Sequence, residues 1–270
     1  MAANYKYEIV KQPSQDLSGQ ALRELHTSLC ELGALCLNPL PDYQVFVKDL
    51  SVAFGGKILV LARQGDQLVG FVSVVTIATP KLEHAIIHSG LTCIHPEHQR
   101  WQGILQQLFA NLFLHLLTEY PTGVWMTTVT NIVSSLVHMN KYSINSFPSP
   151  HWERERQSAQ PSEVHLRIAR EFSARHRRIA LVSPAAEFDE RNFVFRGSNA
   201  FEDAAAFDKD IDNGKHWHRD RETSAFYRSF LRPGSGDEVL LVGFLDPTHM
   251  KTITSGERFR SQWKDKYAKL

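Results

Sequence analysis

A change of hydrophobic period within residues 91–113 constrains the fold of this chain more than any other feature. Before Pro96, apolar and polar residues alternate, which is the period of a β-strand. After Gly103, apolar residues recur at spacings of one, three and four, which is the period of an amphipathic helix. The pattern therefore predicts a strand, a short loop and a long helix, in that order.

The start of the predicted helix has the properties of an anion site. The first N–H groups of a helix have no partner within the helix, and the helix dipole adds positive potential there. Phosphate groups are natural occupants of such a position. We therefore expect a phosphate-bearing ligand here, and the alternative is an ordinary strand-loop-helix unit without one. The loop residues expected at this position are Arg100, Trp101, Gln102 and Gly103.

Periodicity predicts further elements on both sides of this unit. Two apolar runs at residues 57–63 and 68–77, joined by a polar turn that contains a glycine, predict a β-hairpin. Leucines at intervals of three or four between residues 18 and 37 predict an amphipathic helix. The other predicted elements are strands at residues 5–10, 85–94 and 123–130 and a helix at residues 131–139.

Residues 94–105, which read IHPEHQRWQGIL, resemble the acyl-CoA-binding signature of the GNAT superfamily of N-acetyltransferases. In that signature a strand leads through a proline-containing loop to an Arg/Gln-x-x-Gly-x-Gly/Ala motif that opens a long apolar helix. Arg100 and Gly103 match the motif, whereas Leu105 stands where the family has a second Gly or Ala. The predicted order β-α-β-β-β-α-β-α is also that of the family, so the resemblance covers roughly residues 5–150.

The resemblance implies an α/β (α+β) fold with a mixed, mostly antiparallel, twisted sheet flanked by helices. Residues 1–150 would form the acyl-CoA-binding core, and residues 151–270 a C-terminal extension that completes the sheet. Within the extension, residues 238–245 form an apolar run that predicts a buried strand, with residues 193–196 as its partner. Residues 200–232 would then be an inserted element or lid. The alternative to completing the sheet is that the extension forms a separate small domain.

The resemblance also implies acyl-CoA, carrying an acetyl or longer group, as co-substrate for transfer to a small-molecule or peptide amine. In such a transfer a base takes a proton from the amine, backbone N–H groups polarise the thioester carbonyl, and an acid protonates the leaving thiolate. No metal is implied. The residues expected to bind the cofactor are Thr92, Cys93, Ile94, Arg100, Trp101, Gln102, Gly103, Ile104, Leu105, Asn131 and Ser134.

Four residues are candidates for the catalytic acid and base. His138 stands at the helix position where family members often carry a tyrosine near the sulfur, and Tyr142 follows one helical turn later. Glu83 and His88 lie before or on the predicted central strand, where members commonly place a base. Each of the four has a structural alternative as a surface or hydrogen-bonded core residue. Cys93 is expected to be a buried structural thiol, because no base adjoins it.

Composition argues against several other classes of protein. A net charge of +1 offers no general attraction for nucleic acid or an anionic membrane. No apolar run reaches spanning length, and the first residues lack the hydrophobic region of a signal peptide. Three cysteines without metal-type spacing favour a reducing, cytoplasmic environment.

Two classes of function are compatible with these patterns. The preferred hypothesis is an acyl-CoA-dependent N-acyltransferase, favoured by Arg100, Gly103 and Asn131. The alternative is a GNAT-fold protein without acyl transfer, either a ligand-binding or partner-binding module or a lyase or cyclase that uses the same cleft. Leu105 and the histidine at position 138 favour this alternative. The aromatic residues expected to form the core of the extension are Trp217, Phe226, Tyr227 and Phe230.

Overall fold

The chain divides into two compact units. The structure, a computed structural model, describes residues 5–79, 82, 85–99, 103–151, 159–199, 207, 209–255 and 266–270. The first unit comprises residues 1–77 and 87–119, and the second comprises residues 78–86 and 120–270. The domain boundary near residue 150 stays a prediction.

The first unit is built on four strands in the order β1-β2-β3-β4. β1 pairs antiparallel with β2, and β2 with β3, so the predicted hairpin is confirmed. Gly65 has a positive φ of 59° in the hairpin turn, where a side chain would be strained. The strands are β1 (Lys6–Lys11), β2 (Lys57–Gln64), β3 (Gln67–Ile77) and β4 (Ile86–Ile94).

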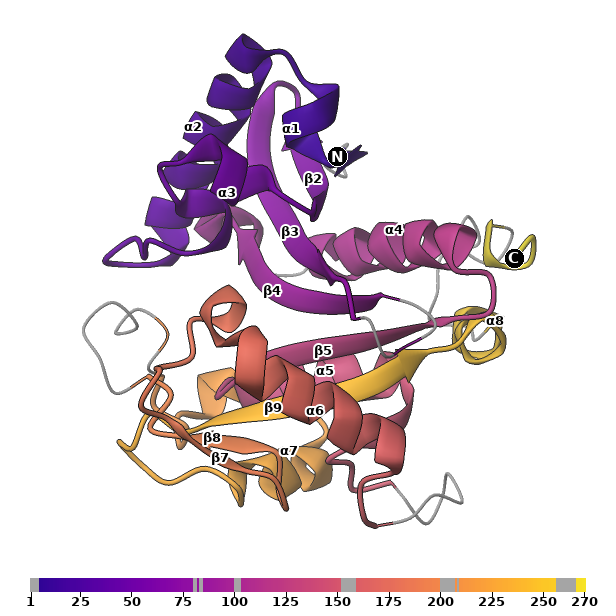
Figure 1. The fold of residues 1–270 in the computed structure, drawn as a ribbon. Helices are drawn as coiled ribbons and strands as arrows, with labels where there is room; N and C mark the ends of the chain where they lie inside the picture. The colour runs from indigo at the N-terminus through magenta and orange to yellow at the C-terminus, as the bar shows by residue number, and fades with distance from the viewer. Residues whose placement is uncertain are drawn as a thin grey trace. The chain divides into compact units, whose positions relative to one another are not determined.

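A long amphipathic helix, α2 (Gly19–Cys36), packs against β3 in this unit. It begins after Ser18, whose side chain accepts a hydrogen bond from the amide of Ala21 at 3.3 Å. The buried leucines of this helix end at Leu32. Leu35 is also part of the predicted stripe, but it is 55% exposed. The shorter helices of this unit are α1 (Pro13–Asp16), α3 (Leu50–Phe54), η1 (Gln44–Phe46) and η2 (Pro96–His98), and Figure 1 shows α1, α2 and α3 in indigo.

The helix predicted after Gly103 is α4 (Ile104–Glu119), which packs against β1, β2 and β3. Its apolar face is buried, as the 3.6-residue period requires. A Cβ added at Gly70 on β3 would lie 3.2 Å from Cγ2 of Ile104 and 3.5 Å from Cδ1 of Leu108. The missing side chain of Gly70 therefore allows the first turns of α4 to lie close to the sheet.

The second unit is built around β9 (Glu238–Leu245), every residue of which is buried except Phe244. β5, β6 and β8 all pair antiparallel with β9. The predicted strand at residues 193–196 is confirmed as its partner, because Val194 pairs with Val239. The remaining strands are β5 (Val124–Thr130), β6 (Ile144–Phe147), β7 (Glu187–Asp189) and β8 (Val194–Arg196).

Helices cover both faces of the β5–β9 pair. On one face the ring of Trp125 contacts the ring of His165 on α6 (Glu163–Arg175), with the two ring centroids 5.4 Å apart. On the other face, Ser143, the residue that ends α5 (Val133–Tyr142), packs directly on Gly243 of β9. A Cβ added to Gly243 would lie 2.7 Å from Cβ of Ser143. Figure 1 shows α6 in front of β9. The other helices of this unit are η3 (Arg177–Ala180), η5 (Gly214–His216), α7 (Arg221–Arg228) and α8 (Pro247–Ser255).

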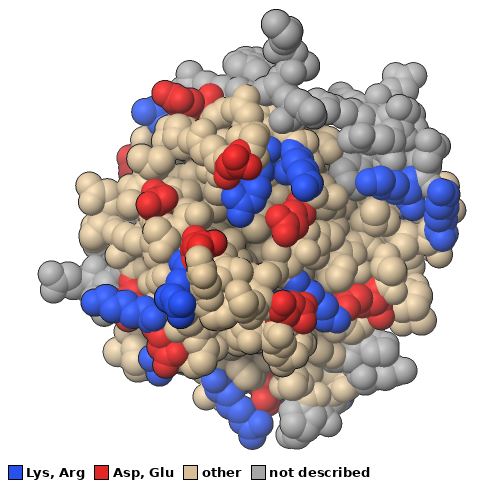
Figure 2. Space-filling view, turned by 90° about the horizontal axis from the view of Figure 1, so that it is seen from above, with Lys and Arg blue, Asp and Glu red and all other residues tan. Residues whose placement is uncertain are grey.

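The predicted fold class is confirmed: the strands form a mostly antiparallel sheet with helices packed on it. The predicted order β-α-β-β-β-α-β-α is also present from β1 to α5, with short helices added. Figure 2 shows blue and red side chains interspersed over the face it displays. Among the described residues, no helix combines the length and the apolar character needed to cross a membrane.

Candidate functional site

The strand β4 carries four of the predicted site residues. His88 and Cys93 are buried, at 1% and 3% exposure, whereas Thr92 is exposed and Ile94 is partly exposed. The side chain of Thr92 is thus the accessible one at the end of this strand, before the loop that leads to α4. The backbone carbonyl of Ile94 accepts hydrogen bonds from Sγ of Cys36 at 3.3 Å and from Nε2 of Gln99 at 3.0 Å.

Cys93 is held in the core of the first unit. The hydrogen bond with Cys36 is the largest cause that raises the pKa of the Cys93 thiol, and burial is the next largest. A thiol that stays protonated is a poor nucleophile. These features agree with the structural role that the sequence predicts for Cys93.

The start of α4 is shaped by Gly103. This glycine has a positive φ of 66°, and a Cβ added to it would meet no atom of the described residues within 4 Å. Its carbonyl accepts a hydrogen bond from the amide of Gln107 at 3.0 Å, which is the first bond of the helix. The amides of the first turn therefore have no intrahelical acceptor. Arg100, Trp101 and Gln102 lie outside the described residues.

The two residues after Gly103 point in different directions. Ile104 is 2% exposed and packs toward β3, whereas Leu105 is 40% exposed. The side chain of Leu105 is thus partly in solvent beside the first turn of α4, at the position where the family motif has a smaller residue.

Sequence reasoning missed Gln44, which adjoins β4. The Gln44 side chain is buried, at 6% exposure. Its backbone has a positive φ of 53°, which is uncommon for a residue other than glycine. Oε1 of Gln44 accepts a hydrogen bond from Oγ of Ser73 at 3.2 Å, and Nε2 donates to Oη of Tyr43 at 3.3 Å. A Cβ at Gly90 would collide with Nε2 of Gln44, so a side chain there would displace the Gln44 amide. No periodicity marks such a residue, because its loop has no regular pattern.

In the second unit, Asn131 combines burial with an unused acceptor. Its side chain is 3% exposed, and Nδ2 donates to the backbone carbonyl of Lys209 at 3.5 Å. Oδ1 is buried and has no hydrogen-bond partner in the described part of the chain. A buried acceptor without a donor is costly, and such atoms often mark the place of a ligand or a water molecule. Ser134, also predicted to bind cofactor, is partly exposed in the first turn of α5.

His138 and Tyr142 lie one turn apart on α5, with ring centroids 4.8 Å apart in an edge-on arrangement. The His138 ring is partly exposed, but its Nε2 atom is buried. Burial, and then the charges of Lys141 and His218, lower the pKa of His138 to about 4. Burial raises the pKa of the Tyr142 phenol. At neutral pH both side chains are therefore uncharged, and Tyr142 keeps its proton.

The predicted site residues thus fall into two groups, one in each unit. The first unit contains His88, Thr92, Cys93 and Ile94 on β4 with Gly103, Ile104 and Leu105 at α4, and the second contains Asn131, Ser134, His138 and Tyr142. Glu83 lies outside the described residues. No group of three or more histidine, cysteine or carboxylate side chains suited to a metal ion was found within the described ranges.

Comparisons with known proteins give matches among solved structures. A GNAT-family protein from Desulfovibrio desulfuricans is 14% identical, over 90% of this chain and 99% of that one, with a TM-score of 0.35. A ribosomal-protein-alanine N-acetyltransferase from Brucella melitensis is 19% identical, over 43% of this chain and 73% of that one, with a TM-score of 0.32. An aminoglycoside 6'-N-acetyltransferase complexed with coenzyme A is 16% identical, over 46% of this chain and 61% of that one, with a TM-score of 0.33.

No protein-family model matches the chain. No curated protein matches it either.

Proposed function

We propose that this chain is an acyl-CoA-dependent N-acyltransferase that acts on a small-molecule or peptide amine in the cytoplasm. The observation that carries this proposal is the junction between β4 and α4. There Gly103, in the left-handed conformation, opens a 16-residue helix whose first amides have no intrahelical acceptor. Amides in that position bind a pyrophosphate through their N–H groups and the helix dipole.

The residues around this junction fit a CoA pyrophosphate. Among the described residues, nothing within 4 Å occupies the space where a Cβ of Gly103 would stand. Arg100, Trp101 and Gln102 are proposed to complete the anion site, and Thr92 and Ile94 to border the pantetheine arm. In the second unit, the unused Oδ1 of Asn131 is proposed to accept a hydrogen bond from the cofactor.

Acyl transfer requires a base and an acid. The amine nitrogen attacks the thioester carbonyl carbon, the C–S bond breaks, and the proton of the amine passes to a base. We propose His88 or Glu83 as that base. Tyr142 is proposed to return a proton to the thiolate, because its phenol stays protonated at neutral pH. The lowered pKa of His138 makes an imidazolium at this position rare at pH 7, so His138 is proposed as a neutral hydrogen-bonding neighbour.

A binding measurement followed by a turnover measurement tests this proposal. Acetyl-CoA at a hundred times its dissociation constant should stabilise the protein by roughly 2.7 kcal/mol, which is seen as a higher melting temperature. Release of free thiol in the presence of an amine panel should follow. Tyr142→Phe should lower kcat and leave acetyl-CoA binding intact, whereas Tyr120→Phe, outside the proposed site, should change neither. Absence of a thermal shift with acetyl-CoA and longer acyl-CoA would contradict the proposal.

The position of Leu105 favours a second candidate function. A side chain of this size, 40% exposed in the first turn of α4, limits how closely a pyrophosphate can approach the backbone. The second candidate is therefore a GNAT-fold protein that binds a ligand without acyl transfer. A thermal shift with acetyl-CoA but no thiol release with any amine would favour it, and Leu105→Ala should then raise the affinity for CoA.

A further inference from the structure

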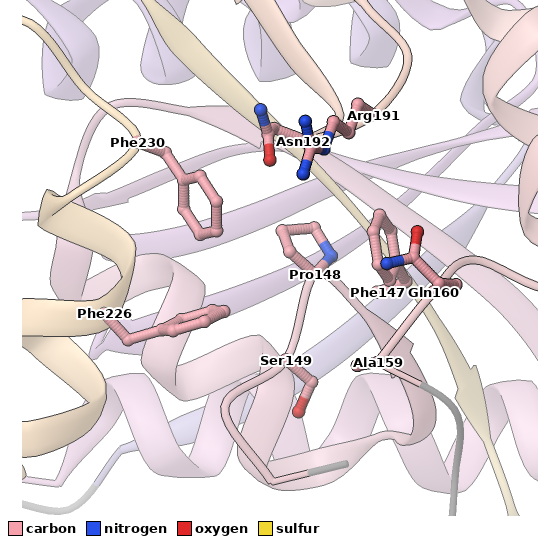
Figure 3. A pocket seen from close by; sticks show the side chains of 9 residues that line it. All are labelled: Phe147, Pro148, Ser149, Ala159, Gln160, Arg191, Asn192, Phe226 and Phe230. Atoms are coloured by element: carbon pink, nitrogen blue, oxygen red, sulfur yellow. The ribbon is translucent and has the colours of Figure 1, made fainter.

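A small pocket lies within the second unit, in the C-terminal extension. Its volume is about 200 Å³. Arg191 and Asn192 come from the turn between β7 and β8, Phe226 and Phe230 from α7 and the turn after it, and Phe147 and Pro148 from the end of β6. Figure 3 shows Phe226 and Phe230 on one side of Pro148, with Arg191 and Asn192 above it. The sequence predicted these aromatic residues as core, but only Tyr227 among them is fully buried.

The aromatic wall of this pocket is fixed by ring contacts. Phe226 and Phe230, four residues apart, meet edge to face with centroids 4.9 Å apart. Phe147 packs on Phe193 at 4.7 Å, and Phe193 is completely buried. The Phe147 side is thus held by the core of the unit. A cavity of roughly 150 Å³ lined by apolar side chains admits benzene, so this pocket has room for a single ring.

Arg191 gives this pocket a solvent-exposed positive charge. Its two acidic neighbours are engaged elsewhere: Asp189 accepts from Nη2 of Arg196 at 2.9 Å, and Glu190 accepts two hydrogen bonds of 2.7 Å from Arg170. Arg191 itself forms no ion pair with any residue that the structure describes. A guanidinium presents paired donors whose geometry matches a carboxylate. The free charge therefore points to an anionic group on the ligand.

Asn192 adds a fixed acceptor beside this charge. Its Nδ2 donates to Oδ2 of Asp189 at 3.0 Å, and its backbone amide donates to Oδ1 at 3.2 Å. These bonds set the orientation of the side-chain amide, and in Figure 3 its oxygen points toward Pro148. The oxygen can accept a hydrogen bond from an N–H or O–H next to the anionic group of a ligand.

We propose that this pocket binds a small monocarboxylate with one apolar ring or a branched chain of similar size. The carboxylate lies on the guanidinium of Arg191, and the apolar part lies against Phe226 and Phe230. This site goes beyond the proposed acyl transfer, because neither acyl-CoA nor the junction at Gly103 takes part in it.

Binding of benzoate to the full chain, measured by calorimetry and by ligand-observed NMR, tests this assignment. Benzoate should bind, and neutral benzamide, which has the same shape, should bind at least about tenfold more weakly. Arg191→Gln should lose about tenfold or more in affinity for benzoate. Arg178→Gln makes the same charge change at an exposed residue outside this pocket and should bind as the parent does. Melting temperatures of both variants check that they fold.

Three results would overturn the assignment. They are no benzoate binding at millimolar concentration, equal binding of benzamide, and unchanged affinity in a folded Arg191→Gln protein. If Arg191→Gln does not fold, Phe226→Ala replaces it, because it removes one ring from the wall and should weaken benzoate binding by about tenfold. Full affinity in Phe226→Ala would then reject the pocket as the binding site.

Discussion

Nη1 of Arg196 donates a hydrogen bond to Oδ2 of Asp237 at 3.0 Å, and the Asp237 side chain has no exposed surface. Arg232 adds two bonds of 2.8 Å to the same carboxylate, and the amide of Gly197 adds one of 3.0 Å. Burial by itself raises the pKa of Asp237, but these donors together hold it well below its usual value. The carboxylate thus ties β8 to the turn that precedes β9.

Replacing this carboxylate should destabilise the second unit strongly. Asp237→Asn leaves two arginines beside a neutral amide, and we expect the free energy of unfolding to fall by about 3 kcal/mol. Asp212→Asn is the matched control, because Asp212 pairs with Arg228 but its side chain is 57% exposed. Its loss should stay below about 1 kcal/mol. Urea unfolding of both variants measures the difference, and equal losses would contradict the role given to Asp237.

A side chain at Gly103 should strain the backbone and weaken cofactor binding. With a φ of 66° and open space around it, Gly103 resists substitution through its conformation and not through crowding. Gly103→Ala should lower stability by about 1 kcal/mol and reduce the thermal shift given by acetyl-CoA. Gly214 also has nothing within 4 Å of an added Cβ, but it has no positive φ. Gly214→Ala should therefore leave stability unchanged or higher, as thermal melting can show.

The His138 imidazole should make stability depend on pH below neutrality. Its pKa is lowered from 6.5 to about 4 in the fold, so between these values the unfolded chain takes up a proton that the folded chain refuses. Stability from this residue is therefore present above pH 6.5 and is lost as the pH falls toward 4. The loss should be about 2 kcal/mol, allowing for the partly exposed ring.

Comparing the parent with His138→Gln between pH 7 and 4.5 isolates this contribution from that of the other histidines. Denaturant unfolding at each pH gives the two curves. The variant should lose less stability on acidification than the parent. Parallel curves would show that His138 has an ordinary pKa in the fold.

Cys93 should be the slowest thiol to react with iodoacetamide in the native protein. It is 3% exposed and its pKa is raised, whereas Cys30 and Cys36 are both partly exposed. Peptide mapping by mass spectrometry should show Cys36 labelled at least about tenfold faster than Cys93, since reactivity follows thiolate content and access. All three should label alike in urea. Early labelling of Cys93 would mean that β4 is open to solvent.

Local pattern was enough to predict most elements of the fold. The strand ending at Ile94 and the helix beginning at Ile104 were both foreseeable, because a buried face imposes its period on neighbouring residues. The extent of burial was less predictable. Leu35 continues the leucine stripe of α2 but is 55% exposed, because the period marks a face of the helix and not how far along it the packing extends.

The candidate site was only partly visible in the sequence. Gly103 stood out because a turn into a helix often needs a glycine. Gln44 did not, because its place beside Gly90 depends on a loop folding against a strand far away in the chain. Arg191 escaped notice for a similar reason: only the fold shows that its acidic neighbours in sequence pair with Arg170 and Arg196.

The sequence by itself determined the order and type of the elements and the position of the glycine that opens α4, because these follow from short-range periods and backbone preferences. Tertiary structure alone decided which polar atoms lack a hydrogen-bond partner among the described residues, such as Oδ1 of Asn131, and which charged groups form no ion pair there, such as Arg191. Hydrogen bonds and ion pairs are made between residues distant in the chain. Their presence or absence is therefore a property of the packed molecule.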